Sequence, residues 1–237
     1  MMNAITLIAA ISLGQTPGQT ARPLVNNAVS TMLVKYANAS TVVADILFTQ
    51  SSNGKSLKIE SYLQYSRDQK LYLKQTYQQN QVIVVSDGKF LSYSIPRDFT
   101  TSAGKMIVEQ QGKLNIVDVY TAGSQSLFDA SPMLDVLVSR SKYLKFLTKQ
   151  WSALRWEDSN SDELIAVGDW RMKEDLAPSG TFRLEMSPSG DPIRYTVIER
   201  IVIPNNRIDL EVISDWQVNA KFNTPIEEAL FNTSNPR

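Results

Sequence analysis

The feature that most constrains the fold is a period of two in the apolar residues between positions 41 and 95. After Lys55, the odd positions Leu57, Ile59 and Leu63 are apolar, whereas Lys58 and most of the other even positions are polar. This alternation is typical of β-strands that bury one face. It predicts strands over 41–51, 55–67, 70–79, 81–86 and 89–95.

Two dipeptides divide this region into hairpins. Asn53-Gly54 and Asp87-Gly88 each separate two predicted strands. Both central residues of a type I′ turn have positive φ, which Gly adopts freely and Asn or Asp tolerates. We therefore expect a hairpin turn at each dipeptide, of type I′ at Asp87-Gly88, and a meandering antiparallel sheet.

The same pattern returns near the C-terminus, separated by turn-rich pieces such as Pro188 to Asp191 and Asn205-Asn206. A chain of 237 residues is long enough to form one large β domain. The further predicted strands cover 152–158, 163–172, 181–186, 192–203 and 207–218.

Two segments have helical spacing. The first starts near Pro23, with Leu24, Ala28, Met32, Leu33 and Tyr36 recurring at helical intervals. The second follows Ser131-Pro132, a good N-cap and first-turn residue. One face of this second helix carries Leu134, Leu137, Leu144, Leu147 and Trp151, and its lysines and arginine lie mostly elsewhere.

The second helix has more than one interpretation. It covers one side of the sheet and exposes a solvated basic face, or it closes an apolar pocket as a lid. Its basic face also suits contact with an anionic membrane surface. A lid also covers the sheet, so these interpretations are compatible.

The C-terminal segment contains Thr224, Pro225 and Glu227 at the spacing of a capping box with Pro at the first helical position. The adjacent Glu227 and Glu228 are interpreted as capping residues, because neighbours on a helix do not face one another as an acid–base pair would.

The N-terminus indicates export. Ile5 to Leu13 is an uncharged apolar run of signal-peptide length, followed by small residues that place cleavage between about Gly14 and Ala21. The alternative is a buried N-terminal helix or strand. The predicted organisation is a signal peptide over 1–21 and one domain over 22–237, periplasmic or otherwise exported and soluble after cleavage.

The chain contains no Cys and no His. This excludes disulfides, thiol nucleophiles and His-dependent catalytic triads, and it argues against an ordinary zinc site. Equal numbers of acidic and basic residues argue against nucleic-acid binding. We therefore expect a protein that is not an enzyme and has no cofactor, no metal and no nucleic-acid partner.

Several motifs resemble the periplasmic lipoprotein carriers of the LolA type. The most specific is Val85-Ser86-Asp87-Gly88-Lys89, with Leu91, Tyr93 and Pro96 following. Arg67 lies where the family has an arginine at a strand end, and Phe222, Thr224 and Pro225 fall near its C-terminal aromatic and proline segment. The chain departs from the family at Asp68, where a proline is usual.

The resemblance implies a mainly β fold with helices (α+β), an antiparallel, unclosed half-barrel with covering helices and an apolar cavity. In the family this cavity holds the acyl chains of a lipoprotein, and the arginine helps to hold a lid closed. The expected function is therefore a carrier or sensor of lipid or lipoprotein acyl chains. The alternative is a structural or regulatory protein-interaction domain with a filled core. The expected cavity and lid residues are Leu63, Tyr65, Arg67, Leu91, Tyr93, Leu134, Leu137, Leu144 and Leu147.

Overall fold

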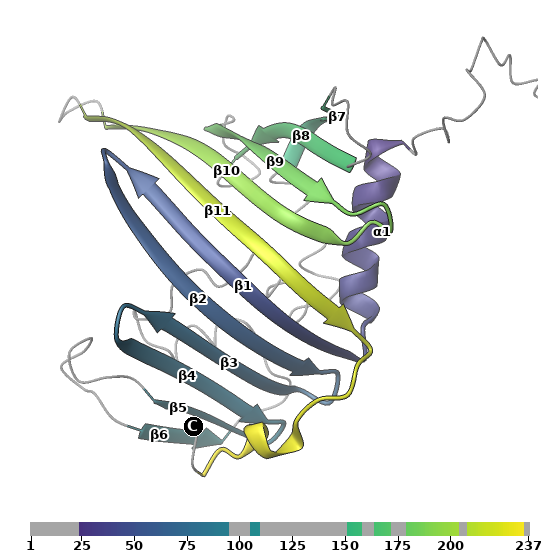
Figure 1. Ribbon diagram of the computed structural model, residues 1–237, viewed down its shortest axis with the longest axis vertical. Helices are drawn as coiled ribbons and strands as arrows, with labels where there is room; N and C mark the ends of the chain where they lie inside the picture. Colours follow the sequence, from purple (N-terminus) through teal and green to yellow (C-terminus); the bar gives the residue numbers. More distant parts are fainter. Residues whose placement is uncertain are drawn as a thin grey trace, which may run out of the picture.

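The computed structural model describes residues 24–94, 105–109, 151–157, 164–171, 179–203 and 208–234. Its strands form one antiparallel sheet in the order β6-β5-β4-β3-β2-β1-β11-β10-β9-β8-β7 (Figure 1). β6 and β7 lie at opposite ends, so the sheet is not closed into a barrel. The strands are β1 Thr41–Ser52, β2 Lys55–Ser66, β3 Lys70–Tyr77, β4 Asn80–Asp87, β5 Phe90–Ser94, β6 Lys105–Glu109, β7 Trp151–Trp156, β8 Leu164–Trp170, β9 Gly180–Met186, β10 Pro192–Ile203 and β11 Ile208–Phe222.

At the centre of the sheet, the first strand of the described chain pairs with the last. β1 pairs with β11 from Val42 opposite Phe222 to Ser52 opposite Val212. Hairpins then extend the sheet outward on both sides, through β2 to β6 and through β10 to β7. The mainly β, antiparallel and unclosed architecture predicted from the sequence is confirmed.

The helix α1 (Val25–Asn38) packs against one face of the sheet, which we call the inner face. Its buried side chains are Val29, Met32, Leu33 and Tyr36, at the i, i+3, i+4, i+7 spacing of an amphipathic helix. They join a core formed by alternate residues of the strands. The helix begins at Val25, and Leu24 is an exposed N-cap residue outside the apolar stripe.

A smaller core lies on the opposite, outer face of the sheet. Tyr72, Ile83 and Val85 of β3 and β4 pack there against Phe231 of the 3₁₀-helix η4 (Glu228–Phe231). The predicted capping box is wrong, because no side chain of the segment caps η4. Instead, the Glu227 N–H donates to the side-chain oxygen of the buried Gln64 at 2.8 Å.

The two hairpin dipeptides behave differently. Asn53 and Gly54 have φ of 48° and 73°, so both residues are left-handed, as a type I′ turn requires. At the second hairpin, Ser86 pairs with Leu91, and the loop is Gly88-Lys89 instead of Asp87-Gly88. Among its residues only Gly88 has positive φ, at 93°, which is the pattern of a type II′ turn.

The Asp87 carboxylate explains this one-residue shift. It accepts hydrogen bonds from the backbone N–H groups of Lys89 at 2.8 Å and Phe90 at 2.7 Å. These bonds satisfy two donors at the start of β5 and fix Asp87 as the last residue of β4. Thr233 of the C-terminal segment donates to the same carboxylate at 3.1 Å.

Trp151 was expected on the apolar face of a helix, and this is wrong. It begins β7, where it pairs with Trp170 and is buried. The predicted signal peptide over 1–21 and the other positions of the second predicted helix lie outside the described residues. No helix in the described part of the chain is long and apolar enough to cross a membrane.

Candidate functional site

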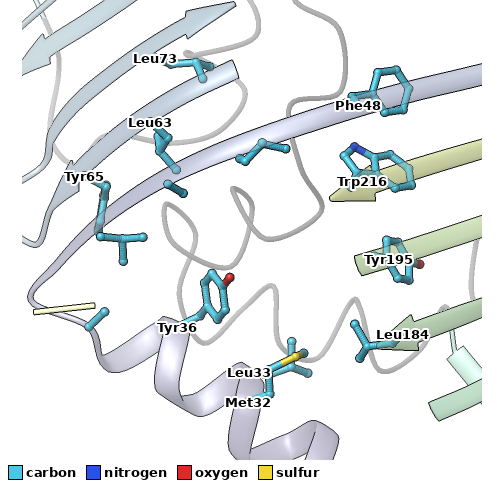
Figure 2. Packing of buried hydrophobic residues seen from close by; sticks show 14 of the residues in the cluster. Met32, Leu33, Tyr36, Phe48, Leu63, Tyr65, Leu73, Leu184, Tyr195 and Trp216 are labelled. Atoms are coloured by element: carbon cyan, nitrogen blue, oxygen red, sulfur yellow. The ribbon is translucent and has the colours of Figure 1, made fainter. Parts of the chain in front are cut away.

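The inner face is the candidate site, and it holds three of the residues predicted to line a cavity. Leu63 and Tyr65 of β2 are buried there in the main core (Figure 2). Leu91 of β5 is buried in the same core. Tyr93 pairs with Val84, which is itself buried in this core. Leu134, Leu137, Leu144 and Leu147 lie outside the described residues, so their place in a cavity stays a prediction.

Arg67 lies in the turn between β2 and β3, next to the end of α1. Its guanidinium Nη2 donates to the backbone carbonyl of Asn38, the last residue of the helix, and its N–H donates to the carbonyl of Ser40 at 2.8 Å. The last carbonyls of a helix lack intrahelical partners and carry negative partial charge, so a cation is stabilising there. Arg67 therefore joins the sheet to α1. Its role at a lid stays a prediction.

Five aromatic side chains form a continuous group on the inner face, and of these only Trp151 was noted in the sequence, as part of a helix. Each ring lies near the next, from Phe48–Trp216 with centroids 5.0 Å apart to Trp151–Phe182 at 4.8 Å. The Trp151 indole N–H donates to the Tyr195 hydroxyl at 3.0 Å. We call this set the aromatic group: Phe48, Trp151, Phe182, Tyr195 and Trp216.

A signal for this group was present in the sequence. Trp216 lies at the same parity as the buried or half-buried Val218, Ala220 and Phe222 in a strand of period two. The group as a whole could not be predicted, because the sequence pattern does not contain the pairing register of the strands. Only the pairing of β1, β11, β10 and β9 places Phe48, Trp216, Tyr195 and Leu184 in one row.

Two alanines lie side by side on the inner face, and we call this pair the alanine strip. Ala44 of β1 pairs with Ala220 of β11 on one side and with Leu63 of β2 on the other. Ile46 and Val218 separate the strip from the Phe48–Trp216 pair of the aromatic group. Both alanines belong to the main core or pack against it, and Ala44 is buried.

In the described part of the chain, the inner face is formed mainly by uncharged side chains. Asp215, the one charged residue among the described buried side chains, lies next to Trp216 in β11 and therefore on the outer face. Glu199 of β10 lies at the margin of the inner face, and burial raises the pKa of its carboxyl despite a hydrogen bond from Ser179. The described residues contain no group of three or more potential metal ligands. The arrangement therefore suits an apolar ligand.

The outer face carries a groove of about 480 Å³ over β8, β9 and β10. Val167, Thr181 and Ile198 contribute to its floor, and their positions alternate with those of the inner-face residues. At its rim, Arg183 forms an ion pair with Glu157 at 2.8 Å. Arg155 also lines the groove and is exposed.

Several solved structures match most of this chain. The fold resembles that of LolA superfamily proteins. One such protein from Nitrosomonas europaea matches with a TM-score of 0.37 and 8% identity, over 90% of this chain and 99% of that one. LprF from Mycobacterium bovis matches with a TM-score of 0.40 and 8% identity, over 86% of this chain and 96% of that one.

MucB, in a structure of the Pseudomonas aeruginosa MucA/MucB complex, matches with a TM-score of 0.42 and 13% identity, over 86% of this chain. The chain spans about three fifths of that protein's length, since 60% of it is covered. No family model and no curated protein sequence matches the chain. At these identities the likeness to the LolA-like half-barrels concerns the fold alone.

Proposed function

We propose that the protein is an exported carrier or sensor that binds lipid acyl chains against the inner face of its half-barrel. The observation that carries the proposal is the inner face itself. It combines an aromatic group, aliphatic side chains and the alanine strip, and Asp215, the one charged residue among the described buried side chains, lies on the other face of β11. Burial of apolar surface supplies the binding energy for such a ligand.

The alanine strip supports the proposal because Ala44 and Ala220 extend no further than Cβ and adjoin Leu63 on the inner face. Ligand pockets are typically lined by hydrophobic and aromatic side chains with few polar groups. An acyl chain laid along Ala44 and Ala220 would contact the aromatic group on one side and Leu63 on the other.

A pair of substitutions on β11 tests this site. Ala220→Phe adds a ring on the inner face, whereas Asn219→Phe adds the same ring on the outer face at the next position. Phe is favoured in strands, so both variants should fold. With a fluorescent fatty-acid probe, we expect Ala220→Phe to weaken binding at least about tenfold and Asn219→Phe to leave it unchanged, by analogy with an occluded pocket.

Native mass spectrometry of protein purified without detergent provides an independent measurement. A co-purified lipid supports the carrier function. Failure of the wild-type protein to bind any acyl probe or to retain a lipid would refute it.

A second candidate function is a regulatory protein-interaction domain. Four of the six exposed large hydrophobic residues in the described chain lie on one strand, β10. They are Ile193, Ile198, Ile201 and Val202, and Ile198 also lines the outer-face groove. Ile198 and Val202 share one face of β10, and exposed apolar residues gathered on one face are typical of contact surfaces. Loss of partner binding in Ile198→Ser, with acyl-probe binding unchanged, would distinguish this function from the first.

A further inference from the structure

The hydroxyl of Tyr36 is a buried polar group without a hydrogen-bond partner in the described part of the protein. The residue is 2% exposed and lies on the apolar stripe of α1. Leaving a buried donor unsatisfied costs free energy, and such groups in folded proteins call for an explanation. A phenylalanine would fill the same place in the core without this cost.

The position of this hydroxyl relates it to the inner-face site. The Tyr36 ring packs edge-to-face on Phe222 of β11, with centroids 4.7 Å apart. Phe222 lies two residues beyond Ala220 on the same face of that strand. Figure 2 shows Tyr36 between the Leu63–Tyr65 side and the Trp216–Tyr195 side, with its hydroxyl directed away from α1. The oxygen is therefore aimed into the region that the proposed ligand occupies.

The hydroxyl is a neutral donor. Burial, and to a smaller extent the Asp191 carboxylate, raises the pKa of Tyr36 above the usual tyrosine range. Asp191 itself forms an ion pair with Lys35 of α1, whose ammonium lies 4.7 Å from the centroid of the Phe222 ring. Lys35, which precedes Tyr36 on α1, is thus already paired.

These surroundings select the chemistry of the ligand. A charged carboxylate would lose its hydration on the inner face and find no unpaired cation among the described core residues, which is costly. A neutral carbonyl oxygen loses much less and accepts one hydrogen bond from the Tyr36 hydroxyl. On the basis of the acyl-binding function proposed above, we propose that Tyr36 recognises the carbonyl oxygen of an acyl ester or amide. It thereby favours esterified or amide-linked lipids over free fatty acids.

The test compares two neutral lipids of equal chain length. They are methyl palmitate and hexadecyl methyl ether, which lacks the carbonyl. Each displaces a fluorescent acyl probe from the wild-type protein and from Tyr36→Phe. We expect the wild type to bind the ester about tenfold more tightly than the ether, as one net hydrogen bond provides. Palmitate at pH 8 should bind more weakly than the ester.

In Tyr36→Phe the preference for the ester should disappear, while ether binding is unchanged. Its thermal midpoint should be equal or higher, because the variant removes an unsatisfied hydroxyl and keeps the ring. Tyr62→Phe, on the outer face, is the matched control and should retain the preference.

Two results would overturn the proposal and leave the acyl-binding function intact: equal binding of ester and ether by the wild type, or an unchanged preference in Tyr36→Phe. A wild-type protein that binds neither compound would overturn both the proposal and the function on which it rests.

Discussion

Replacing Gly88 by alanine should destabilise the fold more than the same change at Gly54. Both glycines have positive φ, 93° and 73°, so both alanines carry backbone strain. A Cβ added at Gly54 meets no heavy atom within 4 Å, whereas a Cβ at Gly88 lies 2.8 Å from the backbone oxygen of Asp68. The comparison therefore separates backbone strain from steric contact.

The expected magnitudes follow from these two terms. A non-glycine residue in the left-handed region costs about 1–2 kcal/mol, which is all that Gly54→Ala should lose. Gly88→Ala has in addition to displace the turn that contains Asp68. That turn is held in place by the Ser86 hydroxyl, which donates to the Gln69 carbonyl at 2.8 Å. We expect a total loss of about 3 kcal/mol, the upper range for a strained backbone position.

Thermal unfolding followed by tryptophan fluorescence measures the difference, since the chain contains 4 Trp residues. In a protein of this size, 1 kcal/mol corresponds to about 2–4 °C in the midpoint. Gly88→Ala should therefore lower the midpoint by about 6–12 °C and Gly54→Ala by about 2–8 °C. Equal shifts, or a larger shift for Gly54→Ala, would refute the role of the Asp68 contact.

Three further predictions concern polar groups. Burial alone would raise the pKa of Asp87, but hydrogen bonds from Phe90, Lys89 and Thr233 lower it below its usual value of 3.8. The stabilisation by the carboxylate is therefore present above about pH 4 and is lost as the pH falls. In urea titrations, the difference in unfolding free energy between wild type and Asp87→Asn should shrink from pH 6 to pH 3. Tyr195→Phe should cost about 1–3 kcal/mol in the same assay, because the buried Trp151 N–H loses its acceptor; an unchanged midpoint would contradict this hydrogen bond. Arg67→Leu should change the binding of a fluorescent fatty-acid probe while stability stays within about 1 kcal/mol, and unchanged binding would exclude the predicted lid role.

The strands were predictable because each buries one face, and burial leaves a period of two in the sequence. The strand β2, predicted over 55–67, forms as Lys55–Ser66. The strand order was not predictable from this pattern. Pairing of β1 with β11 depends on the packing of residues more than 150 positions apart, such as Phe48 opposite Trp216, and periodicity carries no register.

The predictions from local motifs were wrong where other side chains supply the contacts that the motif was expected to supply. Asp87 satisfies the amides at the start of β5, so the loop moved one residue beyond the expected dipeptide. Gln64, on β2, replaces the expected capping box near Glu227. Trp151 extends an apolar helical pattern in the sequence, but stacking on Phe182 and the bond to Tyr195 place it in β7.

The attachment of α1 bears on how a ligand could reach the inner face. Two exposed polar contacts hold the helix to the sheet, the Lys35–Asp191 ion pair and the Arg67 bond to the Asn38 carbonyl. Exposed contacts of this kind contribute about 0–1 kcal/mol each. The four buried side chains of α1 are worth about 1.5–3 kcal/mol each, or roughly 6–12 kcal/mol together, which is comparable with the whole stability of a domain. Breaking the polar contacts therefore does not free the helix, and α1 is a fixed wall of the site. If the proposed function holds, a ligand enters along the part of the inner face that α1 does not cover.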